Sequence, residues 1–298
     1  MHEASQQEAW SPLIIGTMRL GKWGVQMDRK TLAHFIDECL DLGLKDFDHA
    51  DIYGHYTTES DFGEVIKNRP DLKNKVRVTT KCGIKMICDN RPNHRIKSYD
   101  SSKEHIIASA EKSLDALGID CIDLLLLHRP DYLMHPAEIA SAFEQLKQQG
   151  KVKAFGVSNF SASQLDLLHS YTPLVNHQIE ISLLHLDAFE NGTLDQCIKL
   201  GIAPSAWSPF GGGSIFSDSD DPQIQRIQKV TNQLAQRYEA TSDQILLAWL
   251  LKHPAGILPV LGTSKISRIK NAMAALHIQL SREEWYELWQ AAIGTEVA

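Results

Sequence analysis

Short apolar runs alternate with longer segments of helical period from near the start of the chain to near its end. A short apolar run bounded by turn residues and rich in β-branched side chains is typical of a buried strand. Eight such runs are predicted as strands, at Leu13–Ile15, Leu44–Phe47, Val76–Thr80, Cys121–Leu127, Ala154–Val157, Val175–Ile179, Ala203–Trp207 and Ile257–Leu261.

The segments between these runs place apolar residues three or four positions apart, which is the spacing of one helix face. Predicted helices with this pattern cover Thr31–Leu42, Ser102–Leu117 and Ala137–Lys147, and a final helix lies near Arg282–Ala292. Capping boxes, in which two side chains bond the free N–H groups of a helix start, are expected at Ser101/Glu104, Ser161/Gln164, Thr241/Gln244 and Ser281/Glu284. Helices should end at Gly43, Gly118, Gly150 and Gly201.

Strands that alternate with helices pair in parallel, because a parallel pair needs a long crossover connection. Eight strand–helix units within 298 residues favour a closed (β/α)8 TIM barrel, an α/β fold, over an open doubly wound sheet. Periodicity does not show closure, so the open sheet stays an alternative. No linker divides the chain, and we expect one domain over residues 1–298. Two long connections, Gly83–Asp100 and Ser208–Asp221, have a length that is usually functional or mobile.

Composition and charge exclude several classes of protein. A formal net charge of −7 offers no broad cationic surface to nucleic acid or anionic lipid. No apolar run approaches the ~20 residues of a membrane span. The first ten residues, MHEASQQEAW, lack the basic and apolar regions of a signal peptide, and the five cysteines are scattered without a CxxC pair. We therefore expect a cytosolic protein that binds neither nucleic acid nor membrane.

Four polar residues follow the predicted strands in a chemically useful set: Asp48, Tyr53, Lys81 and His128. The carboxyl ends of the strands carry the active site in TIM barrels. Tyrosine is a weak acid with an ordinary pKa of about 10, and a cation such as Lys81 would lower that pKa. Asp48 would keep Lys81 charged and oriented, while His128 would bond the same carbonyl oxygen as Tyr53. This arrangement suits hydride addition, in which negative charge develops on oxygen.

Other interpretations of the same residues stay open. Asp48 and Lys81 could form a structural ion pair, and His128 could be a buried core histidine. Asp48, His49 and Asp51 could hold the metal of a barrel hydrolase or lyase, although their spacing matches no strong zinc motif. We therefore expect no bound metal.

Six motifs resemble those of the aldo-keto reductase family and occur in the family's order across nearly the whole chain. FDHADIYGHYTTE resembles the family signature, and VTTKCG and IDLLLLHRPD resemble the strands of the catalytic lysine and histidine. KVKAFGVSNF, AWSPFGGG and ILPVLGTSKISRI resemble the family's fifth-strand, seventh-strand and C-terminal cofactor motifs. The resemblance implies a catalytic tetrad of Asp48, Tyr53, Lys81 and His128. Within the family, DHADIYG and AWSPFGGG look most like the bacterial oxidoreductases related to the potassium-channel β-subunits.

The resemblance also implies that NADP, as NADPH, lies across the barrel mouth, whereas the chain has no G-x-G-x-x-G motif for a Rossmann site. The implied cofactor residues follow five of the strands: Gly16, Thr17, Met18, Ser158, Asn159, Gln178, Trp207, Ser208, Pro209, Phe210, Gly211, Gly212, Gly213, Gly262, Thr263, Ser264, Lys265, Arg268 and Asn271. Trp207 would stack on the nicotinamide. Lys265 and Arg268 would favour NADPH, because its additional phosphate is dianionic. Ala272 departs from the pattern, since many relatives have Asn there against the adenine.

Taken together, the resemblance implies a monomeric oxidoreductase that reduces small-molecule aldehydes or ketones to alcohols, with Tyr53 as general acid. A second hypothesis is an NADP-binding regulatory or sensor protein with slow turnover. Substrate preference would depend on Trp23 and on the loops Gly83–Asp100, Arg129–His135 and Ser208–Asp221. The sequence does not resolve this preference, because one methylene in a pocket changes it by only ~1–3 kcal/mol.

Overall fold

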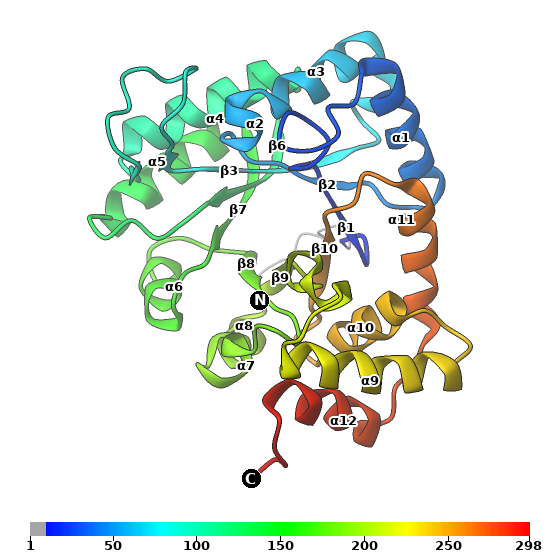
Figure 1. The fold of residues 1–298 in the computed structure, drawn as a ribbon. Helices are drawn as coiled ribbons and strands as arrows, with labels where there is room; N and C mark the ends of the chain where they lie inside the picture. Colours follow the sequence, from blue (N-terminus) through cyan, green and yellow to red (C-terminus); the bar gives the residue numbers. More distant parts are fainter. Residues whose placement is uncertain (1–9) are drawn as a thin grey trace, which may run out of the picture.

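Eight parallel strands close into a barrel in the computed structural model, which describes residues 10–298 (Figure 1). The strands are β1 (Ile14–Gly16), β2 (Asp46–Asp48), β3 (Arg77–Cys82), β6 (Ile122–Leu127), β7 (Val152–Ser158), β8 (Asn176–Glu180), β9 (Ala203–Trp207) and β10 (Leu258–Leu261). Their order around the barrel is β1-β10-β9-β8-β7-β6-β3-β2. The predicted barrel and its eight strands are confirmed, and the open sheet is excluded. Most of the N-terminal segment that was expected to lack a signal peptide lies outside the described residues.

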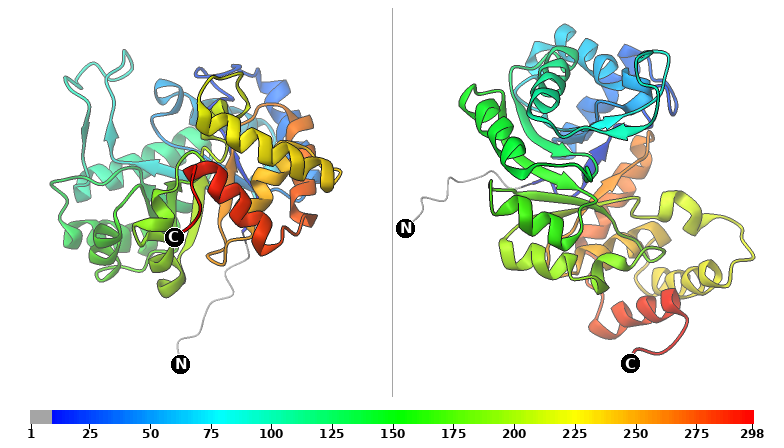
Figure 2. Two further views of the ribbon diagram at one scale, coloured as in Figure 1. Left: turned by 60° about the horizontal axis from the view of Figure 1, so that its bottom comes forward. Right: turned by 90° about the vertical axis from the view of Figure 1, so that its left-hand side faces the viewer.

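Helices surround the barrel on all sides (Figure 2). The longer ones are α1 (Arg29–Asp41), α3 (Thr58–Asn68), α4 (Lys103–Leu117), α5 (Pro136–Gln148), α6 (Ala162–His169), α8 (Thr193–Leu200), α9 (Pro222–Arg237), α10 (Ser242–Leu251), α11 (Ile266–Met273) and α12 (Arg282–Ile293). Single turns form α2 (Tyr53–Tyr56) and α7 (Asp187–Glu190), and 3-10 turns form η1 (Pro70–Leu72), η2 (Gly211–Phe216) and η3 (Ala274–His277). No helix of the described residues is both long and apolar enough to cross a membrane.

Three of the four predicted capping boxes are present, at Ser161, Thr241 and Ser281. The fourth prediction is wrong by one residue, because Ser102 caps α4 by accepting from the N–H of His105. Ser101 instead donates its N–H and its hydroxyl to Asp131, at 3.0 and 2.9 Å. Ser101 is thus bonded to the carboxylate of a neighbouring loop, although the capping-box spacing predicted it as the N-cap of the helix.

The barrel core explains why the strands are nearly continuous apolar runs. Both faces of a parallel sheet are covered, by the barrel interior on one side and by helices on the other. Leu124–Leu127 of β6 accordingly have side chains between 0 and 2% exposed. The strand register then aligns the polar strand ends. Gly16 pairs with Asp48 and Ser158 pairs with Gln178, so residues from distant parts of the chain meet in one layer at the barrel mouth.

The long connection after β3 is a small hairpin rather than an irregular loop. β4 (Ile84–Lys85) pairs antiparallel with β5 (Ser98–Tyr99), with Ile84 opposite Tyr99. The hydroxyl of Tyr56 anchors the hairpin by donating to the carbonyl of Ile84 and accepting from the N–H of Met86. The pairing brings Ile84 and Tyr99 to the edge of the barrel mouth.

Candidate active site

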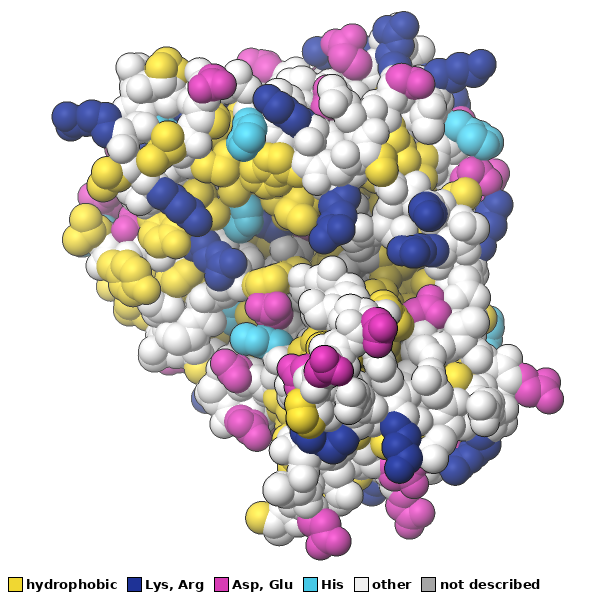
Figure 3. Space-filling model, viewed as in Figure 1, with side chains coloured by type: hydrophobic (Ala, Val, Ile, Leu, Met, Phe, Trp, Pro, Cys, Tyr) yellow, Lys and Arg dark blue, Asp and Glu magenta, His cyan; other side chains and the backbone are white. Residues whose placement is uncertain are grey.

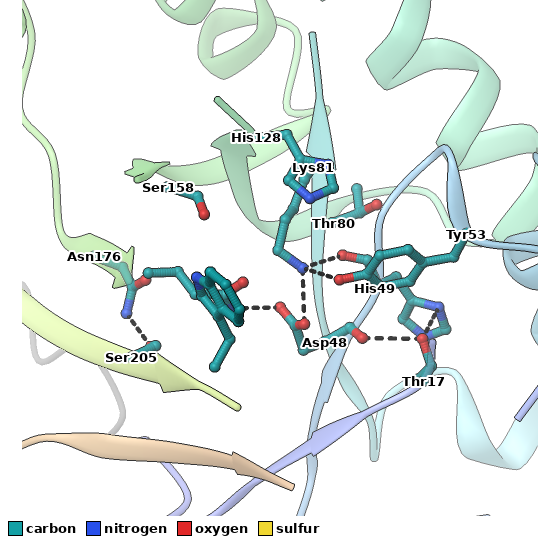
Figure 4. Close-up of polar contacts among 12 residues, drawn as sticks. Thr17, Asp48, His49, Tyr53, Thr80, Lys81, His128, Ser158, Asn176 and Ser205 are labelled. Atoms are coloured by element: carbon teal, nitrogen blue, oxygen red, sulfur yellow. Dashed lines mark hydrogen bonds and ion pairs between the residues drawn. The ribbon is translucent and has the colours of Figure 1, made fainter. Parts of the chain in front are cut away.

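Lys81 is the centre of a buried polar network at the ends of β2 and β3 (Figure 4). Its ammonium donates to Asp48 Oδ2 at 2.7 Å, to the carbonyl of His49 at 2.7 Å and to the hydroxyl of Tyr53 at 3.1 Å. The Lys81 side chain is completely buried. A buried ammonium that satisfies three acceptors is held in one position. The structure therefore brings together three of the four predicted tetrad residues by direct contact.

Two further residues fix the carboxylate of this network. Gln178, from β8, donates to Asp48 Oδ1 at 2.8 Å, so both carboxylate oxygens of Asp48 are bonded. Thr17 donates its N–H and its hydroxyl to the backbone carbonyl of Asp48, at 3.0 and 2.9 Å. We expected both residues to contact the cofactor. Gln178 does face the cavity, but Thr17 is 1% exposed and does not line it, because its polar groups turn inward to β2.

His128, at the end of β6, places its ring near that of Tyr53. The ring centroids are 6.0 Å apart and the planes are almost perpendicular. Nδ1 of His128 is buried and has no hydrogen-bond partner among the described residues. Tyr53, on the turn that opens α2, also contacts Trp23, with ring centroids 6.1 Å apart. The four residues predicted as a tetrad therefore lie together, and Trp23 adds an aromatic wall beside them.

The electrostatics of the site differ in one respect from the expectation. Burial raises the pKa of Tyr53, and the nearby charge of Lys81 opposes this rise without reversing it. The expected net lowering is wrong, because the phenolate would lose more hydration than one ammonium returns. For Lys81, burial acts to lower the pKa, but Asp48 and Tyr53 raise it overall. Burial, and then the charge of Lys81, hold the pKa of His128 well below its ordinary value. At neutral pH the site therefore contains a neutral tyrosine, a charged lysine and a neutral imidazole.

A cavity of about 920 Å³ opens above this network. It corresponds to the hollow near the centre of the face in Figure 3. Most of the predicted cofactor residues line it: Gly16, Met18, Ser158, Asn159, Gln178, Trp207, Ser208, Pro209, Phe210, Gly212, Gly213, Gly262, Thr263, Arg268 and Asn271. Four predicted residues do not line it, namely Thr17, Gly211, Ser264 and Lys265. A Cβ on Gly211 would lie 2.6 Å from Leu184, so this glycine packs against protein rather than against the cavity.

Trp207, Asn159 and Ser158 form a second network on the opposite wall. The indole N–H of Trp207 donates to Asn159 Oδ1 at 3.0 Å, and the amide of Asn159 donates to Ser158 Oγ at 2.7 Å and to the carbonyl of His128 at 3.3 Å. Asn159 and Ser208 both have positive φ, of 61° and 50°. The sharp turns after β7 and β9 thereby direct these side chains across the mouth.

Several residues of the cavity wall were missed by sequence reasoning: Arg19, Ile52, Ser242, Asp243, Val260, Leu261 and Ser267. Others lie where a role was expected but were not singled out as lining residues: Ile84, Lys97, Tyr99, Arg129 and Phe216 in the three loops expected to set substrate preference, and Ala272 at the position expected against the adenine. Arg129 had a usable signal, since it directly follows His128 at a strand end. Lys97 and Tyr99 lie in the loop Gly83–Asp100, which was expected to influence substrate preference, but no signal singled them out, because only the β4–β5 pairing brings them to the mouth. Asp243 is placed by Asn271, whose amide donates to it at 2.9 Å.

The metal interpretation finds no support in the side chains around β2. No group of three or more His, Cys, Asp or Glu among residues 10–298 could hold a metal ion. Asp48 is bonded to Lys81 and Gln178, and His49 is completely buried with Nδ1 3.0 Å from the hydroxyl of Thr17.

The fold and the site define a (β/α)8-barrel protein with a buried Tyr–Lys–Asp–His cluster at its mouth, and comparison with known proteins gives its family. The chain belongs to the aldo/keto reductase family, whose model matches residues 12–293. A crystal structure of a thermostable aldo-keto reductase in complex with the inhibitor epalrestat superposes with a TM-score of 0.80 and covers 98% of both chains. At 24% sequence identity this match shows the fold alone.

Closer relatives cover nearly the full length of the chain. The 6-dehydroglucose reductase of Agrobacterium fabrum is 43% identical over 284 residues, which are 93% of this chain and 94% of that protein. The uncharacterized oxidoreductase YcsN of Bacillus subtilis is 42% identical, over 97% of this chain and 96% of its own. The oxidoreductase YdhF of Escherichia coli is 41% identical, over 99% and 97%. The family and these relatives make the chain an oxidoreductase.

Proposed function

We propose that the protein reduces aldehydes or ketones to alcohols with NADPH, and that Tyr53 is the general acid. The observation that carries this proposal is the contact of the Tyr53 hydroxyl with the ammonium of Lys81, at 3.1 Å beneath an open cavity. Tyr53 can thus give its proton to an oxygen in the cavity while Lys81 stabilises the phenolate left behind. Family membership supports the same reaction class.

The residues present fit a nicotinamide dinucleotide. A Cβ at Gly212, Gly213 or Gly262 would meet no protein atom within 4 Å, so the backbone there leaves open space for a ligand. Gly212 and Gly213 have positive φ, which side chains rarely adopt. The cavity also reaches Thr263, Ser267 and Arg268 at the start of α11. Free N–H groups at a helix start, together with Arg268, suit a phosphate group.

A bound reduced nicotinamide supplies the hydride for the carbonyl carbon. The residues of the chain itself position the reactants and donate the proton. Trp207 and Asn159 form the wall on which a planar ring can stack. Tyr53 donates its proton to the carbonyl oxygen as charge develops there. Asp48 keeps Lys81 charged, and Gln178 keeps Asp48 in place.

His128 would act as a neutral partner of the carbonyl oxygen. Burial and the charge of Lys81 keep its pKa well below the ordinary range, so its imidazole carries one N–H at neutral pH. A neutral donor orients the oxygen toward Tyr53 without competing as the proton source. Lys265 and Arg268 support a preference for NADPH, although only Arg268 lines the cavity.

Stopped-flow oxidation of NADPH by an aromatic aldehyde tests this function directly. The purified protein should oxidise bound NADPH in a single turnover with equimolar alcohol formed, and it should use NADPH better than NADH. The rate should be unchanged after treatment with a chelator. Tight NADPH binding without oxidation by any aldehyde or ketone of a broad panel would contradict an enzyme and favour the regulatory hypothesis. Loss of activity after chelator treatment would favour the metal-dependent barrel hydrolase or lyase.

Three further points stay predictions beside this proposal. They are the closer kinship to the potassium-channel β-subunit branch, the monomeric state and the cytosolic location. Light scattering of the purified protein tests the monomeric state.

A further inference from the structure

Two cationic side chains stand at the cavity close to His128. Arg129 directly follows His128, and its guanidinium carbon lies 5.7 Å from the ring centroid of Trp207. Lys97 immediately precedes β5 and lines the same cavity. After burial and Lys81, these two charges contribute to the lowered pKa of His128, which agrees with their proximity. Both cations are therefore within reach of a ligand that contacts His128.

The carboxylates close to Arg129 and Lys97 in the sequence accept hydrogen bonds from other residues. Asp131, two residues after Arg129, accepts the N–H and hydroxyl of Ser101 and the N–H of Leu133. Asp100, three residues after Lys97, accepts from Ser102 and from Lys85. Within residues 10–298, neither Arg129 nor Lys97 forms an ion pair. Their charges remain available to a ligand.

The cavity wall is electropositive although the chain as a whole carries a net charge of −7. Its cations are Arg19, Lys97, Arg129 and Arg268, and its carboxylates are Asp48 and Asp243. Asp48 is neutralised by the buried ammonium of Lys81, at 2.7 Å. Basic side chains accordingly gather around the hollow in Figure 3. A concave site lined by one sign of charge attracts the opposite charge.

The barrel geometry separates these cations into two sets. Arg268 follows β10 and Arg129 follows β6, and these strands lie on opposite sides of the eight-stranded barrel. Arg268 stands at the start of α11, which suits the cofactor phosphate. The guanidinium of Arg129 reaches from the end of β6 to the Trp207 ring, whereas Lys97 lies two residues before Tyr99, which belongs to an apolar cluster with Ile52, Ile84, Trp23 and Tyr53 that lines the same cavity. The cavity beside His128 therefore combines an apolar wall with two cations that form no ion pair among the described residues.

We propose that Arg129 and Lys97 bind an anionic group of the substrate, so that the preferred substrates are aldehydes or ketones with an apolar or planar body and a carboxylate, sulfonate or phosphate. This proposal rests on the proposed reductase function. The anionic group takes no part in the reaction, in which the carbonyl gains a hydride at carbon and the Tyr53 proton at oxygen. Arg129 can bond two oxygens of such a group in parallel, whereas Lys97 adds a single charge.

A matched pair of para-substituted benzaldehydes tests the proposal. The ratio of kcat/KM for 4-carboxybenzaldehyde to that for 4-methylbenzaldehyde is measured with NADPH in the wild type and in variants. Comparing this ratio between proteins cancels the intrinsic reactivity of each aldehyde. Arg129→Gln and Lys97→Gln should each lower the ratio by about tenfold, the effect of one charge-assisted hydrogen bond. Arg129→Lys should keep part of the preference, and 4-formylbenzenesulfonate and 4-formylphenyl phosphate then identify the favoured anion.

Controls distinguish this binding site from the cofactor site. Lys199→Gln removes one exposed charge on α8, away from the cavity, and should leave the ratio unchanged. Fluorescence titration of NADPH should give nearly the same Kd for the wild type and Lys97→Gln. If Arg129→Gln weakens NADPH binding and both aldehydes lose rate equally, Arg129 belongs to the cofactor and the proposal is overturned. A ratio unaffected by both substitutions also overturns it. If the wild type reduces neither aldehyde, the proposed function itself fails.

Discussion

At the scale of single residues, Lys81 determines the geometry of the site. Its ammonium has three acceptors, and one of them, Asp48, is itself bonded by Gln178. Removing one partner of a buried ion pair costs about 3–5 kcal/mol, so the network strongly favours this one arrangement of its side chains. Rigid donors aimed at the reacting oxygen need no rearrangement during the reaction. The position of the Tyr53 hydroxyl is thus fixed by residues from three different strands.

The pH dependence of turnover follows from these ionisation states. Burial raises the pKa of Tyr53, so the protonated form needed for reduction persists through neutral and mildly alkaline pH. The pKa of Lys81 is also raised, and His128 stays neutral. We predict that kcat/KM for carbonyl reduction is flat from about pH 6 to 9 and falls only above the ordinary tyrosine value of about 10, because the pKa of Tyr53 is raised. Initial rates at constant ionic strength measure this profile. An acid limb centred near the ordinary histidine value would contradict a neutral His128.

At the scale of elements, the β4–β5 hairpin forms one wall of the substrate side. Tyr56 joins the hairpin to α2 through the carbonyl of Ile84 and the N–H of Met86, at 3.2 and 3.0 Å. The guanidinium of Arg91 lies over the same ring at 4.1 Å. The position of Lys97 and Tyr99 at the mouth therefore depends on Tyr56, three residues after Tyr53.

Tyr56→Phe removes only the hydroxyl of this anchor. We predict faster amide exchange across residues 84–99 and a several-fold higher KM for the carbonyl substrate, because losing one hydrogen-bonding group costs about 1 kcal/mol. Hydrogen-exchange mass spectrometry and steady-state kinetics measure both effects. Tyr171→Phe, at a side chain that is 53% exposed, is the control. Unchanged exchange in the hairpin would show that the Tyr56 hydroxyl does not hold it.

Whether an element can be predicted from the sequence depends on whether local residues or distant contacts determine it. The eight barrel strands are visible in the sequence because burial on both faces requires continuous apolar runs. The four residues of the predicted tetrad are visible because Asp48, Lys81 and His128 stand at or next to strand ends and Tyr53 follows in the turn after β2. The hairpin is not, since β4 and β5 have two residues each and carry no periodic pattern. The bonds from Gln178 to Asp48 and from Ser101 to Asp131 are also invisible, because they join residues 130 and 30 positions apart.

At the scale of the whole molecule, the C-terminal helix α12 lies against α9, as both views of Figure 2 show. Glu284, near its start, accepts from Arg237 at 2.7 Å, from Tyr238 at 2.6 Å and from the N–H of Ser281 at 2.7 Å. Burial acts to raise the pKa of this carboxyl, but the hydrogen bonds outweigh it and lower the pKa to about 2. One carboxylate thus ties the last helix to the end of α9.

This tie makes part of the stability dependent on pH. A folded-state pKa below the unfolded value stabilises the protein above about pH 4.5, and this contribution is lost as the pH falls toward 2. We predict that Glu284→Gln lowers the free energy of unfolding by about 1–3 kcal/mol at pH 7, since the exposed Arg237 is partly screened by solvent. The difference should shrink toward pH 3 in urea titrations. Glu283→Gln, at the exposed neighbouring residue, should have little effect at either pH. A constant difference across this range would rule out ionisation as its cause.

Replacing one hydroxyl tests the assignment of Tyr53 as the proton donor most directly. Tyr53→Phe removes the acid and leaves the ion pair of Lys81 and Asp48 in place. Its Kd for NADPH, measured by fluorescence titration, should remain close to that of the wild type. The single-turnover rate with an aromatic aldehyde should fall by roughly two to four orders of magnitude, the contribution of a positioned general acid. A variant that binds NADPH normally and reduces the aldehyde at the wild-type rate would contradict the assignment of Tyr53.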